Sequence, residues 1–261
     1  MGGGLLQLVA YGAQDVYLTG NPQITFFKVV YRRHTNFAME AIEQSFNGST
    51  SLGSRVSVLV TRNGDLINRV YFRGTLKNTS KTSNAATCLV PYYGLRLLKN
   101  IELQIGGQSI DKHYSEWLYI WNELSMPVGK KEGYDVMVGG NKNNSSVLLA
   151  HTAEVEVYVP LEFWFCRNVG LALPLIALQY HEVKINIQFE DQNKLILLAA
   201  GALSATEFKL WADYIYLDTD ERRRFAQVSH EYLIEQVQYK SEGIVSGTAK
   251  NIKLNFNHPV K

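Results

Sequence analysis

Cys166 lies in the aromatic stretch EFWFC, where a thiol could act as a nucleophile. A nucleophilic cysteine needs a base held beside it, and histidine is the usual base. The chain has six histidines, none of them in a recognisable nucleophile motif: His34, His113, His151, His181, His230 and His258. We therefore interpret Cys166 as a small buried residue in a strand, flanked by Trp164 and Phe165.

Metal and phosphate chemistry has no clear motif either. His181-Glu182 begins like HExxH, but the position of the second histidine is occupied by Asn186. The sequence contains no His-x-His pair, which a metal-binding jelly-roll enzyme would use, and Gly106-Gly107 lacks the spacing of the phosphate-binding glycine motifs. We predict no catalytic residue, no metal site and no cofactor, so the protein is not expected to be an enzyme.

Several charged groups allow more than one interpretation. Glu154 and Glu156 share one strand face and could do acid/base work, but we interpret them as part of a solvated outer face. The clusters 32–34 and 222–224 could bind phosphates or carboxylates, or could be a solvated strand end and a helix face or interdomain contact. Four Asn-x-Ser/Thr triplets are present, and we expect no ordinary glycosylation at them: Asn47, Asn78, Asn143 and Asn144.

Composition limits the classes of protein further. With 261 residues and 46% apolar side chains the chain can bury a large core. Lysine plus arginine number 26 against 24 acidic residues, so no positive field indicates direct nucleic-acid binding. The two cysteines are too few for a disulfide scaffold, and no stretch reaches the ~18 apolar residues of a membrane span. The first residues lack a secretory signal, and Leu6 replaces the Ser/Thr of a myristoylation motif, which predicts a flexible arm without a lipid.

Alternation of apolar and polar residues is the strongest structural signal, and a period of two predicts half-buried strands. The segment from Val183 to Phe189 alternates without interruption. Gly106-Gly107 follows another alternating segment and predicts a tight hairpin. The remaining candidate strands are 24–31, 38–46, 56–60, 69–76, 101–105, 155–159 and 208–217.

Two helices are expected among these strands. Tyr114, Trp117, Leu118, Trp121 and Leu124 form a helical stripe that stops before a proline, and the two tryptophans are predicted to anchor this helix onto a sheet. A second helix is predicted from Thr219, which would cap it, to Gln236. Many short strands, polar loops and few helices indicate an all-β protein, a β-sandwich or jelly roll with short helical insertions.

Four blocks of sequence resemble the major capsid proteins of nucleocytoplasmic large DNA viruses, the iridovirus, phycodnavirus and mimivirus type. The blocks are YGAQDVYLTGNPQITFFKVVYRRHTNFAMEAIEQSF, IDKHYSEWLYIWNEL, PLEFWFCRNVGLALPLIALQYHEVKI and LDTDERRRFAQVSHEYLIEQVQ. The resemblance implies a double jelly roll, two tandem eight-stranded barrels, and a structural protein without a catalytic site. It also implies localisation in the virion capsid after assembly in the host cytoplasm.

The partners implied by the resemblance are other capsid proteins. Three copies would form a pseudo-hexagonal capsomer, a homotrimer, within an icosahedral shell. This capsomer would contact neighbouring capsomers and minor capsid and penton proteins. Contact with an inner viral membrane would be peripheral at most.

The resemblance also divides the chain into parts. Residues 1–21 would be an N-terminal arm, 22–217 the first jelly roll, and 218–261 a linker helix with the start of an incomplete second jelly roll. The closing stretch NIKLNFNHPVK resembles an early strand of that second barrel, so the sequence looks C-terminally truncated. The alternatives are a carbohydrate-binding jelly-roll module, a jelly-roll enzyme, and a minor capsid or penton paralogue.

Overall fold

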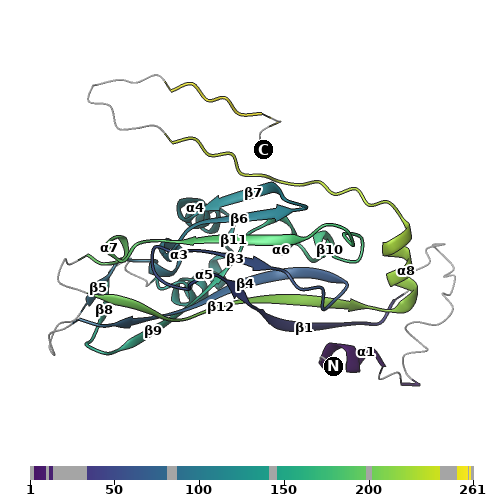
Figure 1. Ribbon diagram of the computed structural model, residues 1–261, viewed down its shortest axis with the longest axis horizontal. Coiled ribbons are helices and arrows are strands. Elements are labelled where there is room, and N and C mark those ends of the chain that lie inside the picture. Colours follow the sequence, from purple (N-terminus) through teal and green to yellow (C-terminus); the bar gives the residue numbers. More distant parts are fainter. Residues whose placement is uncertain are drawn as a thin grey trace.

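The computed structural model describes residues 3–9, 12–13, 34–80, 87–140, 146–197, 202–241, 252–257 and 259. Two five-stranded antiparallel sheets lie face to face and form a sandwich (Figure 1). The first sheet has β1 (Phe37–Gln44), β12 (Leu203–Leu217) and β4 (Leu66–Asn78) in that order, with β9 (Glu154–Pro160) and β10 (Leu173–Pro174) both pairing with β4. The second has the order β2 (Phe46–Asn47), β3 (Arg55–Leu59), β11 (Val183–Phe189), β6 (Leu98–Ile105) and β7 (Gln108–Tyr114).

The strand order identifies the topology. A separate two-stranded sheet pairs β5 (Thr87–Leu89) with β8 (Val147–Leu149). When these two and the two-residue strands β2 and β10 are set aside, eight strands remain. Counted along the chain, they follow the order 1-8-3-6 in one sheet and 2-7-4-5 in the other. This is the double Greek key of a jelly roll, so the predicted fold class is confirmed.

The core follows the predicted alternation. In β11, Val183, Ile185, Ile187 and Phe189 are buried, and the residues between them are half-buried on the opposite face. The neighbouring strand β3 alternates in the same way, with Val56 and Val58 buried. The predicted hairpin joins β6 to β7, and both of its glycines have positive φ, as a type I′ turn requires (59° at Gly106 and 83° at Gly107).

The described residues also include several short α-helices. They are α1 (Gly3–Val9), α3 (Tyr93–Leu97), α4 (Ser115–Ser125), α5 (Val128–Met137), α6 (Trp164–Arg167), α7 (Gln192–Leu195) and α8 (Thr219–Gln227). The helix predicted before Pro127 is α4. The prediction missed α5, which begins directly after the same proline, because a proline suits the start of a helix as well as it stops one.

The second predicted helix was correct in place but wrong in length and cap. Helix α8 ends at Gln227, nine residues before the predicted end, and residues 228–241 are extended. The cap is Asp218, whose carboxylate accepts a bond from the amide of Thr219 at 2.7 Å. The extended part lies against the second sheet, and these contacts replace the helical bonds (Figure 1). The strand predicted at 24–31 lies outside the described residues.

Candidate functional site

The residues with potential chemistry do not form a reactive site within the described part of the chain. Cys166 lies in the short helix α6, not in the predicted strand. Burial raises the pKa of its thiol, so the group is protonated at neutral pH and is a poor nucleophile. No group of three or more His, Cys, Asp or Glu residues among those described is arranged to hold a metal ion. His181 and Glu182 precede β11, and Asn186 lies within that strand.

Glu154 and Glu156 belong to a charged outer face of the first sheet. Glu156 pairs with Arg73 on β4, and Glu154 pairs with Lys77 at 2.9 Å. The row continues across β12, where Lys209 lies 2.7 Å from Glu207. The two carboxylates therefore take part in cross-strand ion pairs, which is the solvated-face alternative.

The predicted sequons differ in accessibility. Asn47 is exposed, whereas Asn78 is fully buried. The amide of Asn78 donates to the carbonyls of Leu149 and Ala150 at 3.0 and 3.1 Å and accepts from Ser80. Asn78 is thus a structural residue of the core edge and cannot carry a glycan in the folded protein. Asn143 and Asn144 lie outside the described residues.

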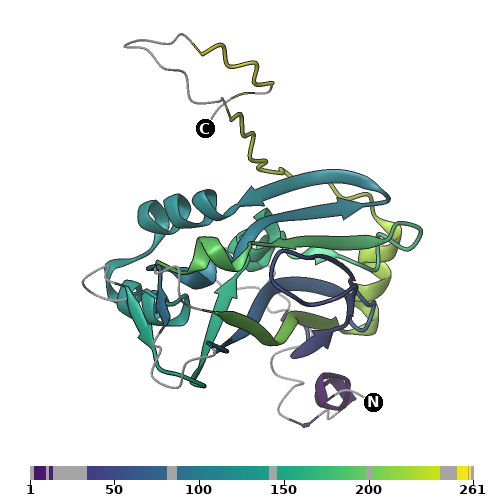
Figure 2. The same ribbon diagram turned by 60° about the vertical axis from the view of Figure 1, so that its left-hand side comes forward.

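The beginning of the chain contacts the sandwich directly. Helix α1 lies below the sheet that contains β1 and β12 (Figures 1 and 2). The amides of Gly3 and Gly4 donate to the two carboxylate oxygens of Glu40 on β1 at 3.0 and 3.1 Å. These bonds lower the pKa of Glu40. The first residues therefore include a docked helix where the sequence predicted only a flexible arm.

The basic cluster 222–224 divides into two roles. Arg222 pairs with Asp65, which is 8% exposed, at 3.0 Å. The Asp65 carboxylate also accepts the amide of Leu217 at 2.8 Å, so this pair fixes α8 at the end of the sandwich. Arg223 and Arg224 are exposed. Of the other basic cluster only His34 is described, and it is exposed.

The two tryptophans of α4 lie against the segment around α6. Their rings are 5.7 Å apart, and Trp117 also faces the ring of His113 on β7. The guanidinium of Arg167 lies over Trp121 at 3.9 Å from the ring centroid. Both tryptophans are half-buried, and the fully buried anchor of the helix is Leu118. The predicted anchoring role therefore extends to Leu118, and the tryptophans connect α4 to α6 as well as to a sheet.

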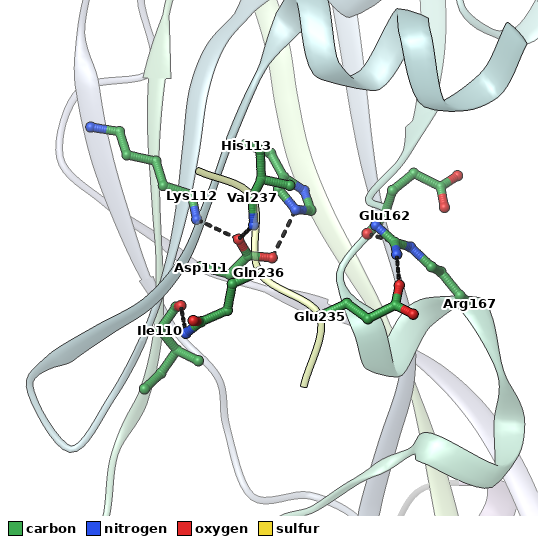
Figure 3. Close-up of polar contacts among 9 residues, drawn as sticks. All are labelled: Ile110, Asp111, Lys112, His113, Glu162, Arg167, Glu235, Gln236 and Val237. Atoms are coloured by element: carbon green, nitrogen blue, oxygen red, sulfur yellow. Dashed lines mark hydrogen bonds and ion pairs between the residues drawn. The ribbon is translucent and has the colours of Figure 1, made fainter. Parts of the chain in front are cut away.

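Residues 229–241, which we call the strap, run over the second sheet beside β7 (Figures 1 and 3). The amide of Val237 donates to Asp111 at 3.0 Å, and Glu235 pairs with Arg167 at 2.8 Å. The amide side chain of Gln236 reaches the carbonyl of Ile110. The strap thus connects α8 to residues 252–257, where the amide of Gln238 bonds both backbone groups of Asn257 at 3.0 Å.

Beneath the strap lies a buried group of ionisable residues. Asp111 and His113 are 4% and 1% exposed, and the Nε2 atom of His113 lies 2.8 Å from the Asp111 carboxylate. Burial raises the pKa of Glu162, and the positive charge of Arg167 and a hydrogen bond from Trp121 oppose that shift. This arrangement binds a segment of the same chain through Asp111 and Arg167.

Large apolar side chains remain exposed around this region. On α4 and α5, Leu124 and Val128 are 80% and 93% exposed. Leu233 of the strap is 83% exposed, and Ile252, Leu254 and Phe256 are also exposed. Exposed apolar side chains of this size are candidates for contacts between proteins. Within the described residues, no helix is long and apolar enough to cross a membrane.

Comparison with known families agrees with this geometry. Residues 25–218 match the family described as "Major capsid protein N-terminus". The chain belongs to this capsid protein family. Residues 221–261 match a second family, "Large eukaryotic DNA virus major capsid protein". The boundary between the two matches falls at the start of α8.

Curated capsid protein relatives match the chain over its full length. The major capsid protein of Pyramimonas orientalis virus is 57% identical and that of Paramecium bursaria Chlorella virus 1 is 49% identical, each over 100% of this chain. The chain covers 64% and 60% of those relatives, and 48% of capsid protein 1 of Acanthamoeba polyphaga mimivirus, which is 46% identical. It therefore spans about half to two thirds of the length of the relatives it matches.

Solved capsid structures share the fold. The quasi-atomic model of the PBCV-1 virus capsid matches with a TM-score of 0.71 and 41% identity, over 90% of this chain and 57% of that one. The Faustovirus major capsid protein matches with a TM-score of 0.60 over 82% of this chain and 60% of that one, and its identity of 14% supports the fold alone.

The contact residues were not identified from the sequence. Glu40, Asp111, Arg167 and Glu235 come from segments far apart in the chain, and no local motif connects them. One signal was present: the alternation in Asp-Lys-His places Asp111 and His113 on the buried face of a strand, where an acid and a base need partners.

Proposed function

We propose that this chain is a structural component of the icosahedral shell of a large DNA virus and belongs to the virion. The observation that carries the proposal is the capsid family match across the whole sandwich, residues 25–218. The likeness to a capsid structure at 41% identity supports the same role. We propose no catalytic role, no metal and no cofactor, in agreement with a buried thiol and ion-paired carboxylates.

The proposed building block is a homotrimer that forms a pseudo-hexagonal capsomer. Such an assembly needs contact surface, and the exposed apolar residues of α4, α5 and the strap supply candidates. Its further partners would be neighbouring capsomers and minor capsid and penton proteins, with no direct nucleic-acid contact and at most peripheral membrane contact. Assembly would take place in the host cytoplasm.

Residues 218–261 are proposed to be the linker helix and the start of a second jelly roll, with 252–257 belonging to one of its early strands. Ile252, Leu254 and Phe256 alternate with polar residues and are exposed, as the inner face of a strand would be before its sheet partners cover it. The separate match of 221–261 to a capsid family supports this division.

The carbohydrate-binding alternative has less support. Sugar-binding sites commonly offer an open aromatic ring, whereas the ring of Trp121 is covered by Arg167 at 3.9 Å. No described feature favours this alternative over a shell protein.

Light scattering on the purified chain tests the proposed assembly. A trimer has three times the 29.5 kDa mass of one chain, and electron microscopy should then show three-lobed particles. Substituting Leu124 and Val128 by serine should weaken the trimer if α4 and α5 contribute to its interface. A chain that remains monomeric at high micromolar concentration would contradict the trimer proposal.

A further inference from the structure

The strap follows an edge that would otherwise be unpaired. Strand β7 is the last strand of its sheet within the described residues. The strap contacts β7 through Gln236 at Ile110 and Val237 at Asp111 (Figure 3), and the ring of Tyr239 lies beside that of Tyr114, so the two segments run in the same direction. An uncovered edge strand is prone to pair with other chains, and the strap therefore shields β7.

Two of the polar contacts between the strap and the sandwich involve charged side chains of the sandwich, beside the bonds from Tyr232 to the carbonyl of Ala172 and from Gln236 to that of Ile110. At the first, Asp111 accepts the amides of Lys112 and Val237 at 2.9 and 3.0 Å. At the second, Arg167 binds Glu235 at 2.8 Å. Arg167 is itself fixed, because its Nε atom donates to the carbonyl of Glu162 and its plane lies over an indole ring. Both receiving groups are thus positioned by the sandwich before the strap arrives.

The strap contributes little to the hydrophobic core. Its residues His230, Tyr232, Glu235 and Val237 are only half-buried, while Leu233 and Tyr239 are 83% and 55% exposed. A segment held by a few polar contacts opens at a lower free energy than the sandwich unfolds. The core strand β11, by contrast, is bonded on both sides by β3 and β6.

We propose that the strap is a latch that opens and closes while the jelly roll stays folded, and that Glu235 and the amide of Val237 hold it closed. In the closed state the latch fixes the direction in which the chain leaves the first domain. In the open state the edge of β7 is uncovered. The occupant of the docking site is the strap of the same chain, because α8, which precedes the strap, is fixed to the same sandwich by Asp65 and Arg222.

The latch goes beyond the proposed shell function. Only the role that the latch would have in a shell rests on that function. In a shell subunit, a closed latch would place residues 252–257 beside the first domain, and an open one would offer β7 to a neighbouring chain. Whether the latch exists can be measured on the isolated chain, so its failure and the failure of the shell proposal are distinguishable.

Amide hydrogen exchange followed by mass spectrometry tests the latch on the full chain. Glu235→Gln removes the ion pair, and Val237→Pro removes the donor that Asp111 accepts; both changes lie on the strap and leave the sandwich intact. Glu235→Gln should speed exchange at the Val237 amide by about tenfold or more, the effect expected from loss of one charge-assisted hydrogen bond, whereas Val237→Pro has no amide at that position and is followed in β7. Exchange in β7 should rise in both variants, while exchange in β11 stays at the wild-type rate.

Glu231→Gln is the matched control. It makes the same charge change on the same strap, and Glu231 is exposed and forms no ion pair with another described residue. Equal exchange in all three variants would overturn the latch, and so would a rise in β11 by the same factor, because the strap would then open only with the sandwich. An increase in mass to a dimer that depends on Glu235 would show instead that the strap binds a second copy.

Discussion

A single methyl group can test how α1 is seated on the sheet. A Cβ atom added to Gly4 would lie 2.7 and 2.8 Å from two ring carbons of Tyr216 and 3.3 Å from Cβ of Glu40. Tyr216 is 4% exposed, so its ring has little room to move. A Cβ added to Gly3 would meet only one carboxylate oxygen of Glu40, at an ordinary 3.9 Å. The two neighbouring glycines therefore differ sharply in the space around them.

The expected difference follows from comparing the two alanine variants. Alanine favours a helix over glycine by about 1 kcal/mol, and this gain is similar at both positions. When the two variants are compared, this gain cancels, and Gly4→Ala differs from Gly3→Ala by the cost of overpacking against Tyr216, about 1 to 3 kcal/mol. That cost lowers the ratio of docked to undocked α1 by a factor of roughly 5 to 150. Gly3→Ala should leave docking unchanged or slightly stronger.

The pKa of Glu40 reports docking directly and can be followed by carboxyl NMR. In the wild type and in Gly3→Ala it should lie below its ordinary value of 4.5, because two amides donate to the ionised form. In Gly4→Ala it should return toward that value. Since docking lowers the pKa of Glu40, the Glu40 carboxylate stabilises docked α1 fully above pH 4.5, and this stabilisation is lost as the pH falls through the lowered pKa. Identical Glu40 titrations in the two variants would refute the steric argument.

Three further outcomes are expected. Leu118→Ala should lower the free energy of unfolding, measured in urea, by about 2 to 5 kcal/mol, whereas Leu124→Ala on the exposed side of the same helix should change it by less than about 0.5 kcal/mol. Equal effects would show that the buried face of α4 is assigned wrongly. Glu162→Gln should raise the free energy of unfolding at pH 8 and have no effect on it near pH 4. The pKa of Glu162 is raised in the folded state, so this group stabilises the fold below pH 4.5, and that stability is lost as the pH rises through the folded pKa. A variant that is less stable than the wild type at pH 8 would contradict this sign. Cys166→Ser and His181→Ala should affect folding or assembly alone, and an enzymatic activity abolished by either in a folded protein would disprove the non-enzymatic role.

The jelly roll could be predicted because its strands carry their own signal. Val183 to Phe189 alternates without a break and is the central strand β11, and Gly106-Gly107 supplies the positive φ of the β6–β7 hairpin. Strand pairing between distant segments was not readable from this pattern. It followed only from the capsid resemblance, which the family match over 25–218 confirms.

The missed features depend on contacts rather than on local sequence. The period of α8 continues in the sequence beyond Gln227, but the docking of Glu235 and Val237 draws that part into an extended strap. Cys166 sits in a helical turn because Phe163, Trp164 and Phe165 pack together into the core, which alternation alone cannot distinguish from a strand. Asn78 looks like a glycosylation site until its burial is known.

The pairing of β1 with β12 sets the order of events during synthesis. Phe37 pairs with Leu217, 180 positions later in the chain (217 minus 37). A ribosome adding about 5 to 20 residues per second needs roughly 10 to 40 s between the two, and until then the first sheet cannot close. The seat of α1 is built from Glu40 on β1 and Tyr216 on β12, so it does not exist before that moment. Residues 3–9 are therefore synthesised long before their docking site exists, and a docked α1 marks a sandwich in which β12 has been translated and paired with β1.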